Sequence, residues 1–311
     1  MVTKSTTRIM WTVNAALLPG LLVLSYYYGW GYVANLAIAL PVGLALEVVC
    51  LKARGQQVTV TDGSAVTTTL ILALALPPNT PGFVIAIAML GAIVLAKHLY
   101  GGLGHNVFNP AMVGYALVLV SFPQALASWP LLGPELGPAL VDANTGATVL
   151  TTFKYREGLT VLEIWQPEAG FGYVGGLGWE WANGGFLLGG LYLCWRRLIA
   201  WRVAAGMLLA LGLLAILWYD GGSSASAGSP LFHWLSAGTM LAAFFVVTDP
   251  VTHPNDFSSQ WLFGLLVGTL TFVIRTWGSY PDGIAFAVIV ANAATPYLNH
   301  VFRRRHAQAT G

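Results

Sequence analysis

Apolar stretches recur along the whole chain, and several are long enough to cross a lipid bilayer. A helix needs about 17 or more apolar residues to span the roughly 30 Å hydrocarbon core. Hydrophobic residues make up 56% of the 311 residues and charged residues only 8%, whereas soluble domains carry about 25% charged residues. The sequence therefore predicts an all-α polytopic membrane protein and excludes an ordinary soluble domain.

Ten stretches are candidate transmembrane helices. The third and fifth are short and follow polar, glycine-containing segments, which is typical of broken or re-entrant helices that line a site. The first stretch is predicted to be a retained helix rather than a signal peptide, because no small-residue cleavage site follows it. The predicted spans are 11–29, 33–51, 64–77, 82–98, 107–122, 184–199, 201–219, 231–248, 258–275 and 283–300.

Clusters of basic residues indicate the orientation. With ten spans, all the clusters fall on one side of the membrane, which the positive-inside rule assigns to the cytoplasm. Both termini are then cytoplasmic, and the long segment 123–183 lies on the outer side. The net charge of +2 gives no indication of nucleic-acid binding. The clusters are Lys4 and Arg8, Lys52 and Arg54, Arg196, Arg197 and Arg202, and Arg303, Arg304 and Arg305.

The chain divides into two five-span halves, 1–122 and 184–311, joined by the outer segment 123–183. LALPPNTP at 74–81 resembles VTDPVTHP at 247–254. Because each half has an odd number of spans, the second half would be inverted relative to the first. We therefore expect two inverted five-helix repeats. Chance similarity between apolar helices that end in proline is the alternative.

Two asparagines mark the start of the fifth predicted span, in the sequence GGLGHNVFNP. Asn106 and Asn109 are three residues apart, so they would share one face of a helix that began there. Two carboxamides on one face can bracket a planar ligand with both donors and acceptors, such as a flavin ring. Helix capping combined with a helix–helix contact is the alternative.

The third predicted span opens with the polar sequence DGSAVTTT at 62–69. We expect Asp62 or Ser64 to cap the helix. The three threonines can bond back to the preceding turn or face a neighbouring helix. Ion coordination by their hydroxyls is the alternative.

Few ionisable residues lie inside the predicted spans, and charges within a membrane are costly enough to be functional candidates. Glu47, in the second span, is the candidate for a proton or cation path. Lys97, His98 and Arg275 lie near span ends, where snorkelling to the interface is a sufficient explanation. The sequence contains no paired zinc ligands and no catalytic triad, so neither a metal site nor a catalytic residue is predicted.

The outer segment contains Thr-Gly-Ala-Thr at 145–148, within DANTGAT at 142–148. With this motif, the asparagine pair and the polar start of the third span, the chain resembles the family of the D subunit of the Rnf electron-transport complex. The same family includes the B subunit of the sodium-translocating NADH:quinone oxidoreductase. The likeness covers nearly the whole chain, and the motif matches the family's [ST]-G-A-T flavinylation motif. The early first span favours the Rnf branch.

The resemblance implies that Thr148 carries FMN through a phosphoester on its hydroxyl. It also implies that riboflavin is bound without a covalent bond, with Asn106 and Asn109 as its ligands. The family's complex lies in the bacterial inner membrane and moves electrons between reduced ferredoxin and NAD⁺, coupled to Na⁺ or H⁺ transport.

This chain lacks a dinucleotide fingerprint and a cysteine cluster. Partner subunits must therefore bind ferredoxin and NAD. We expect iron–sulfur subunits and a second flavinylated subunit among them, and no activity from this chain alone. A channel or secondary transporter for a small solute is the alternative class, since inverted repeats with broken helices also suit a solute path. The motif ending at Thr148 discriminates, because a plain transporter has no use for an attached flavin.

Overall fold

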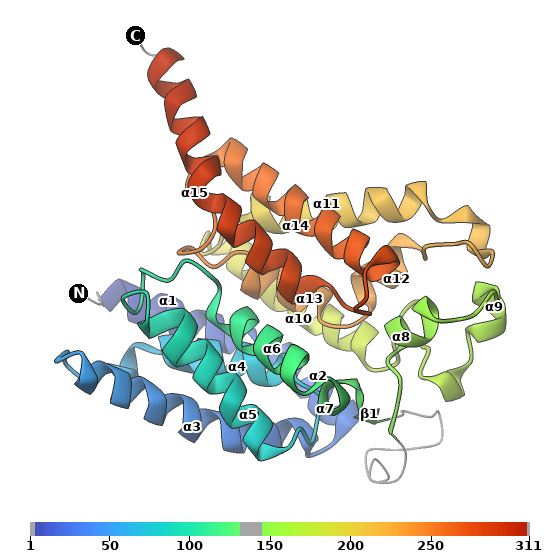
Figure 1. The fold of residues 1–311 in the computed structure, drawn as a ribbon, viewed down its shortest axis with the longest axis horizontal. Coiled ribbons are helices and arrows are strands. Elements are labelled where there is room, and N and C mark those ends of the chain that lie inside the picture. Colours follow the sequence, from blue (N-terminus) through green and yellow to red (C-terminus); the bar gives the residue numbers. More distant parts are fainter. Residues whose placement is uncertain (1–3, 131–144, 310–311) are drawn as a thin grey trace.

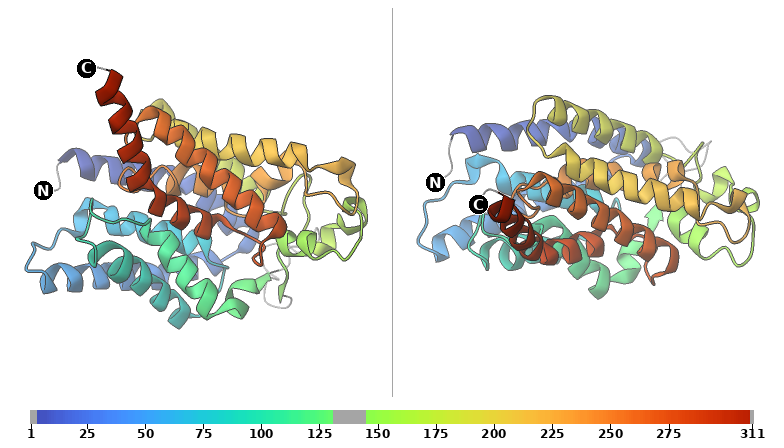
Figure 2. Two further views of the ribbon diagram at one scale, coloured as in Figure 1. Left: turned by 45° about the horizontal axis from the view of Figure 1, so that its top comes forward. Right: turned by 90° about the horizontal axis from the view of Figure 1, so that it is seen from above.

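The computed structural model describes residues 4–130 and 145–309. The described chain is a bundle of helices that run mostly lengthwise (Figure 1). Both termini lie at one end of the bundle, which we call the terminal end (Figure 2). The short helices α8 and α9 lie at the opposite end, which we call the α8 end.

Each of the ten predicted stretches coincides with a helical segment, which confirms the all-α class. In the part of the chain that the structure describes, four segments are long and apolar enough to cross a membrane by length and composition alone. The number of spans and the inverted repeat stay predictions. The four segments are Thr6–Tyr28, Gly31–Ala53, Phe257–Trp277 and Ile284–Phe302.

The first half contains the two short helices that the sequence predicts as its third and fifth spans. Each is 12 residues long, and each follows a polar segment. The elements are α1 (Lys4–Ala16), α2 (Leu18–Tyr28), α3 (Gly31–Ala53), η1 (Val60–Asp62), α4 (Ser64–Ala75), α5 (Gly82–Met89), the π-helix η2 (Leu90–His98) and α6 (Pro110–Ser121).

The joining segment has a small hydrophobic core of its own, in which side chains from α8 and α9 pack on Phe232 of the second half. A short antiparallel pair, β1 and β2, places Trp129 opposite Gly146. Residues 142–144 of the DANTGAT sequence lie outside the described residues. The elements are α7 (Pro123–Ala127), β1 (Trp129–Pro130), β2 (Thr145–Gly146), α8 (Val149–Lys154), α9 (Val161–Ile164) and η3 (Pro167–Ala169).

The second half departs from the prediction in two places. Its first helix begins at Trp179 and not at 184. The first turn of this helix therefore consists of residues that were predicted to belong to the joining segment. The predicted span 231–248 is broken near Ala237, whose φ is +48°. The elements are α10 (Trp179–Trp195), α11 (Trp201–Leu217), η4 (Asp220–Gly222), α12 (Pro230–Leu235), α13 (Thr239–Leu241), the π-helix η5 (Ala242–Val246), α14 (Phe257–Trp277) and α15 (Ile284–Ala309).

Glycines let α10 of the second half pack against α2 and the end of α1. A Cβ added at Gly189 would lie 1.9 Å from the carbonyl oxygen of Ala16, and one at Gly185 would lie 2.8 Å from the backbone nitrogen of Gly20. Small residues at membrane helix interfaces allow such close backbone approach. This contact holds the two halves together between the two ends of the bundle.

Candidate functional site

Thr148 is the N-cap residue of α8. Its backbone is extended (φ −65°, ψ 156°), and its Oγ1 accepts a hydrogen bond of 3.2 Å from the backbone N–H of Thr151. The hydroxyl of Thr151 lies 2.9 Å from the same oxygen. Threonine is a preferred N-cap residue, which explains why the helix starts directly after the Thr-Gly-Ala-Thr motif. The Thr148 hydroxyl is therefore held in a fixed, partly exposed place.

A cavity of about 330 Å³ opens beside Thr148, and we call it the Thr148 cavity. Its volume lies in the range of about 300–1,000 Å³ that is typical of ligand pockets. The rings of Trp129 and Trp179 meet edge to face on its wall, with centroids 5.9 Å apart. Most of the remaining wall is apolar and comes from both halves, including Met112, Tyr115 and Leu119 of α6, Leu241 and Ala242, and Ile284 and Ala285.

Asp282 is the only carboxylate among the described residues that line the Thr148 cavity. Its Oδ1 accepts a hydrogen bond of 3.1 Å from Nε of Arg275 and lies 3.1 Å from Nη2 of the same residue. Arg275 also donates to the carbonyl of His233 and to Oγ1 of Thr239. Its side chain is 1% exposed. The prediction that Arg275 snorkels to the interface is therefore wrong, because the side chain is buried and paired.

Asn106 and Asn109 lie at the terminal end of α6. Because the helix starts after Asn109, Asn106 precedes it, and the prediction that both share a helical face is wrong. Asn109 is the N-cap residue, with Oδ1 accepting from the N–H of Met112 at 3.2 Å. Its Nδ2 donates to the carbonyl of Val246 at 3.2 Å. Capping and a helix–helix contact are thus both present.

The two asparagines nevertheless line one cavity of about 100 Å³, which we call the Asn109 cavity. Ser64 and Lys97 form part of its wall, and Asp249 from the second half lies among its other lining residues. The first two residues of α6 line this cavity, whereas Met112, Tyr115 and Leu119 line the Thr148 cavity. The two cavities therefore adjoin the same helix, with the Asn109 cavity at its start, and both have walls from the two halves.

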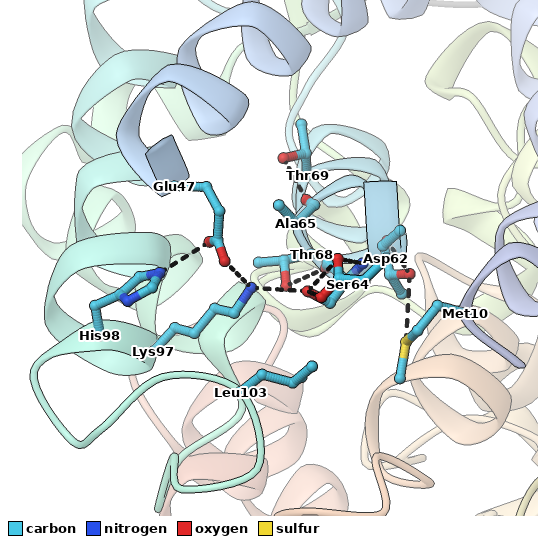
Figure 3. A network of polar contacts seen from close by, with 12 residues as sticks. Met10, Glu47, Asp62, Ser64, Ala65, Thr68, Thr69, Lys97, His98 and Leu103 are labelled. Carbon is cyan, nitrogen blue, oxygen red and sulfur yellow. Dashed lines mark hydrogen bonds and ion pairs between the residues drawn. The ribbon is translucent and has the colours of Figure 1, made fainter. Parts of the chain in front are cut away.

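Glu47 belongs to a buried polar network (Figure 3). Its Oε1 lies 2.8 Å from Nζ of Lys97, and its Oε2 lies 3.0 Å from Nε2 of His98. Lys97 also donates to Oγ of Ser64 at 3.0 Å, and Ser64 donates to Asp62. Lys97 is 2% exposed and His98 is 6% exposed. Snorkelling is therefore the wrong explanation for both side chains, because each turns inward to a carboxylate.

The network reaches the surface through Arg54. Nδ1 of His98 lies 3.4 Å from Nη1 of Arg54. A guanidinium only donates hydrogen bonds, so Nδ1 is the acceptor and Nε2 carries the hydrogen that faces Glu47. Along the network, the cations Arg54 and Lys97 alternate with the carboxylates Glu47 and Asp62. Each buried charge therefore has an opposite charge or a hydrogen-bonding partner beside it, as charges buried in a protein require.

The polar start of α4 behaves as predicted. Oδ1 of Asp62 accepts a hydrogen bond of 2.9 Å from the backbone N–H of Ser64. Thr67 donates to Asn14 on α1 and to the carbonyl of Gly63. The next two threonines donate to the carbonyls four residues earlier. The Asp62 carboxylate therefore accepts from the first N–H of the helix, Thr67 links the helix to α1, and the other two threonines bond back to the preceding turn.

Sequence reasoning missed Asp249, which faces the Asn109 cavity. Its Oδ2 lies 3.5 Å from Nδ2 of Asn109. Asp249 belongs to the sequence VTDPVTHP, which resembles LALPPNTP of the first half. This internal similarity could have identified Asp249 as a candidate. Among the described residues, no group of three or more His, Cys, Asp or Glu side chains gathers as a metal site.

Known proteins resemble this chain along almost its whole length. The model of the NQR2, RnfD, RnfE family matches residues 2–308. The D subunit of the ion-translocating oxidoreductase complex of Pseudomonas aeruginosa (strain UCBPP-PA14) is 46% identical over 313 residues, covering 96% of this chain and 91% of the relative. The corresponding D subunits of Alcanivorax borkumensis (strain ATCC 700651 / DSM 11573 / NCIMB 13689 / SK2) and Klebsiella pneumoniae (strain 342) are 42% and 39% identical. These matches cover 98% and 97% of this chain, and 93% and 95% of the relatives. The chain belongs to the NQR2, RnfD, RnfE family.

Proposed function

We propose that this protein is the flavin-carrying membrane subunit of an Rnf-type ion-translocating oxidoreductase complex. The names of its relatives support membership of such a complex. One observation carries the flavin assignment: the residue whose hydroxyl ends the Thr-Gly-Ala-Thr motif lines a cavity of ligand size.

Thr148 and its surroundings suit FMN attached through a phosphoester. A phosphoester needs a hydroxyl, and Oγ1 of Thr148 is partly exposed beside the Thr148 cavity. The aromatic walls formed by Trp129 and Trp179 offer a surface for a planar ring, since aromatic groups stack favourably. FMN bound there would supply the electron-carrying chemistry. The chain would supply attachment, orientation and exclusion of water.

Riboflavin at Asn106 and Asn109 is the second part of the proposal. Both side chains line the Asn109 cavity, and Lys97 and Asp249 add a cation and a carboxylate to its wall. The cavity volume of about 100 Å³ is below the roughly 300 Å³ of a typical ligand pocket. Riboflavin therefore requires the two halves to separate slightly at this end, where Phe244 and Phe245 of η5 form the facing wall.

Glu47 is our candidate for an ion path. It lies inside the bundle, is 5% exposed, and is connected through His98 to the exposed Arg54. Through Lys97 and Ser64, it also adjoins the Asn109 cavity. A buried carboxylate between a cavity and the terminal end is suited to exchange a proton or Na⁺ there.

In this proposal, the complex moves electrons between reduced ferredoxin and NAD⁺ and couples them to Na⁺ or H⁺ transport. Iron–sulfur subunits and a second flavinylated subunit supply the functions that this chain lacks, so it is inactive alone. The complex lies in the bacterial inner membrane, with both termini of this chain in the cytoplasm. A small-solute channel or transporter is the alternative, and it gives no role to Thr148.

Thr148→Val tests the attachment, because valine keeps the shape of threonine and removes the hydroxyl. We expect the variant to insert in the membrane but to lose the flavin fluorescence that survives denaturation. Electron transfer by the assembled complex should fall strongly. The control is Thr145→Ser, which keeps a hydroxyl at the first position of the motif and should keep its flavin. Both proteins must be made in a host that has the flavin transferase.

Full covalent flavin in Thr148→Val would overturn the assignment. The same conclusion would follow if mass spectrometry placed the FMN mass on Thr145. A flavin-free wild type from a host proven to flavinylate a control substrate would favour the channel or transporter.

A further inference from the structure

The α8 end contains another cavity, of about 210 Å³, which we call the cationic cavity. Lys154, Arg156 and Arg275 all line it, whereas Thr148 does not. The phosphoester proposed at Thr148 therefore leaves this cavity unassigned. Its remaining walls come from α8, α12, the loop before α12, and the end of α14, and include Phe153, Ser226, Phe232, His233, Thr276 and Trp277.

The positive charges around this cavity are poorly neutralised. Nζ of Lys154 donates to three backbone carbonyls, two near the end of α14 and that of Tyr280 in the following loop, at distances of 2.9–3.1 Å. Within the described residues, Arg156 likewise donates to backbone carbonyls alone, those of Phe153, Leu159, Ser224 and Ser226. Carbonyls accept hydrogen bonds but carry no net charge. Among the described residues, Asp282 is the single carboxylate that forms a salt bridge with any of the three cations.

Burial makes this excess of positive charge unfavourable. Partial burial lowers the pKa of Lys154, and it also lowers that of Arg156. Removal of water disfavours a charged group unless an opposite charge is near. An anion in the cavity would offset that cost for both side chains at once.

Two further polar atoms on the cavity residues have no hydrogen-bond partner among the described residues. They are Oγ1 of Thr276 and Nδ1 of His233. His233 is 2% exposed, and its Nε2 lies 2.8 Å from the carbonyl of Ala227. Nε2 must therefore carry the hydrogen, which leaves Nδ1 as an acceptor. The residues that line the cavity thus include an unpaired hydroxyl and an unpaired imidazole nitrogen in addition to the cations.

Trp277, which lines the cavity, belongs to a pair of tryptophans at this end of the bundle. The exposed side chains of Trp218 and Trp277 mark the ends of α11 and α14, and their rings pack edge to face with centroids 5.6 Å apart. Tryptophan is enriched at membrane–water interfaces. Exposed Leu213, Ile216 and Leu217 continue down α11 from this level. Acyl chains can lie along that apolar strip.

We propose that the cationic cavity binds the phosphate of an anionic phospholipid with a hydroxyl-bearing headgroup, of the phosphoglycerol type. Arg156 has five N–H groups and uses four on carbonyls, so one remains for a phosphate oxygen, and the Thr276 hydroxyl supplies a second donor. A headgroup hydroxyl donates to Nδ1 of His233. Basic pockets between membrane helices bind phospholipid headgroups in this way.

Thr276→Asp places a carboxylate in the cavity and tests the proposal, with the neutral Thr276→Asn as the matched control. The full complex is purified in detergent and depleted of lipid. Short-chain phosphatidylglycerol, phosphatidylcholine or inorganic phosphate is then added while the melting temperature is followed. We expect phosphatidylglycerol alone to stabilise the wild type and Thr276→Asn. Thr276→Asp should bind it about tenfold more weakly, since it loses charge-assisted hydrogen bonds.

An equal effect of phosphatidylglycerol on Thr276→Asp would overturn the site, and an equal effect of phosphatidylcholine on the wild type would overturn its charge selectivity. If inorganic phosphate stabilised the wild type as well as the lipid did, the lipid assignment would be wrong. Native mass spectrometry of the wild-type complex gives a test without any variant. We expect a retained anionic phospholipid, and a complex that retains none would contradict the proposal.

Discussion

At the scale of single residues, Glu47 and Lys97 depend on each other inside the bundle. Lys97→Met removes the partner that lies 2.8 Å from Glu47 and leaves a buried carboxylate with only His98 beside it. Loss of one partner from a buried ion pair costs about 3–5 kcal/mol. We therefore expect a large fall in the melting temperature. The exposed Lys52 is at the end of the same helix as Glu47, so Lys52→Met is the control and should change stability little.

The double variant Glu47→Gln, Lys97→Met separates pairing from simple packing. It removes both charges, so it should be more stable than Lys97→Met alone. If the double variant were no better than the single one, the ion pair would not be the source of the lost stability.

The asparagine pair calls for substitutions that respect its structural contacts. Asn109→Ser keeps a side-chain oxygen that can cap Met112 and removes the amide donors without adding a charge beside Asp249. Asn106→Leu removes every donor and acceptor of the other side chain. We expect the combined variant to lose extractable riboflavin while the flavin on Thr148 persists. Asn109→Ser alone shows how much stability the amide donor contributes. Unchanged riboflavin in the combined variant would leave both residues with capping and packing roles only.

Sequence reasoning could find Glu47 but not its partners. A single carboxylate within an apolar stretch is visible in one span, whereas the contact with Lys97 joins residues 50 positions apart. The snorkelling argument fails for Lys97 and Arg275 because it treats each helix as though lipid surrounded it. In the bundle, α3 brings Glu47 to Lys97, and the loop before α15 brings Asp282 to Arg275, so turning inward costs less than reaching the interface.

At the scale of elements, the length of each apolar stretch predicted the positions of the helices better than the positions of their breaks. All ten stretches are helical, because each contains enough apolar residues to be stable as a helix away from water. Gly238 lies in the break, but the positive φ belongs to Ala237, so the sequence marks this break only weakly. It is held by tertiary contacts: Nδ2 of Asn183 donates to the carbonyl of Ala237, and Oδ1 of Asn183 accepts from the N–H of Met240. A pattern within one segment contains no information about such partners.

The contact between α10 and the first half can be tested with two glycines on one helix. A methyl group at Gly189 would meet the carbonyl of Ala16 at 1.9 Å, whereas nothing lies within 4 Å of one at Gly184. Gly189→Ala should therefore push the halves apart and lower the melting temperature. Gly184→Ala should keep or raise it, since alanine favours helix by about 1 kcal/mol over glycine. Equal melting temperatures for the two variants would mean that this contact does not limit stability.

At the scale of the whole molecule, two similar cation contacts support the inverted repeat. Lys97 ends one predicted span and donates to the hydroxyl of Ser64 at the start of α4. Arg275, its counterpart in the second half, donates to the hydroxyl of Thr239 at the start of α13. The first contact lies at the terminal end and the second at the α8 end. Equivalent contacts at opposite ends are what inversion of one half relative to the other would produce.

The orientation of the bundle is the remaining whole-molecule prediction. The basic clusters predict that the terminal end faces the cytoplasm and the α8 end faces outward. Ser128, beside β1, and Gln56, after α3, are both exposed and lie at opposite ends. In a background with Cys50 and Cys194 replaced by serine, a cysteine at Ser128 should react with an impermeant thiol reagent added to intact cells. A cysteine at Gln56 should react only after the membrane is opened. Labelling of both from the same side would rule out this orientation and the ten-span topology with it.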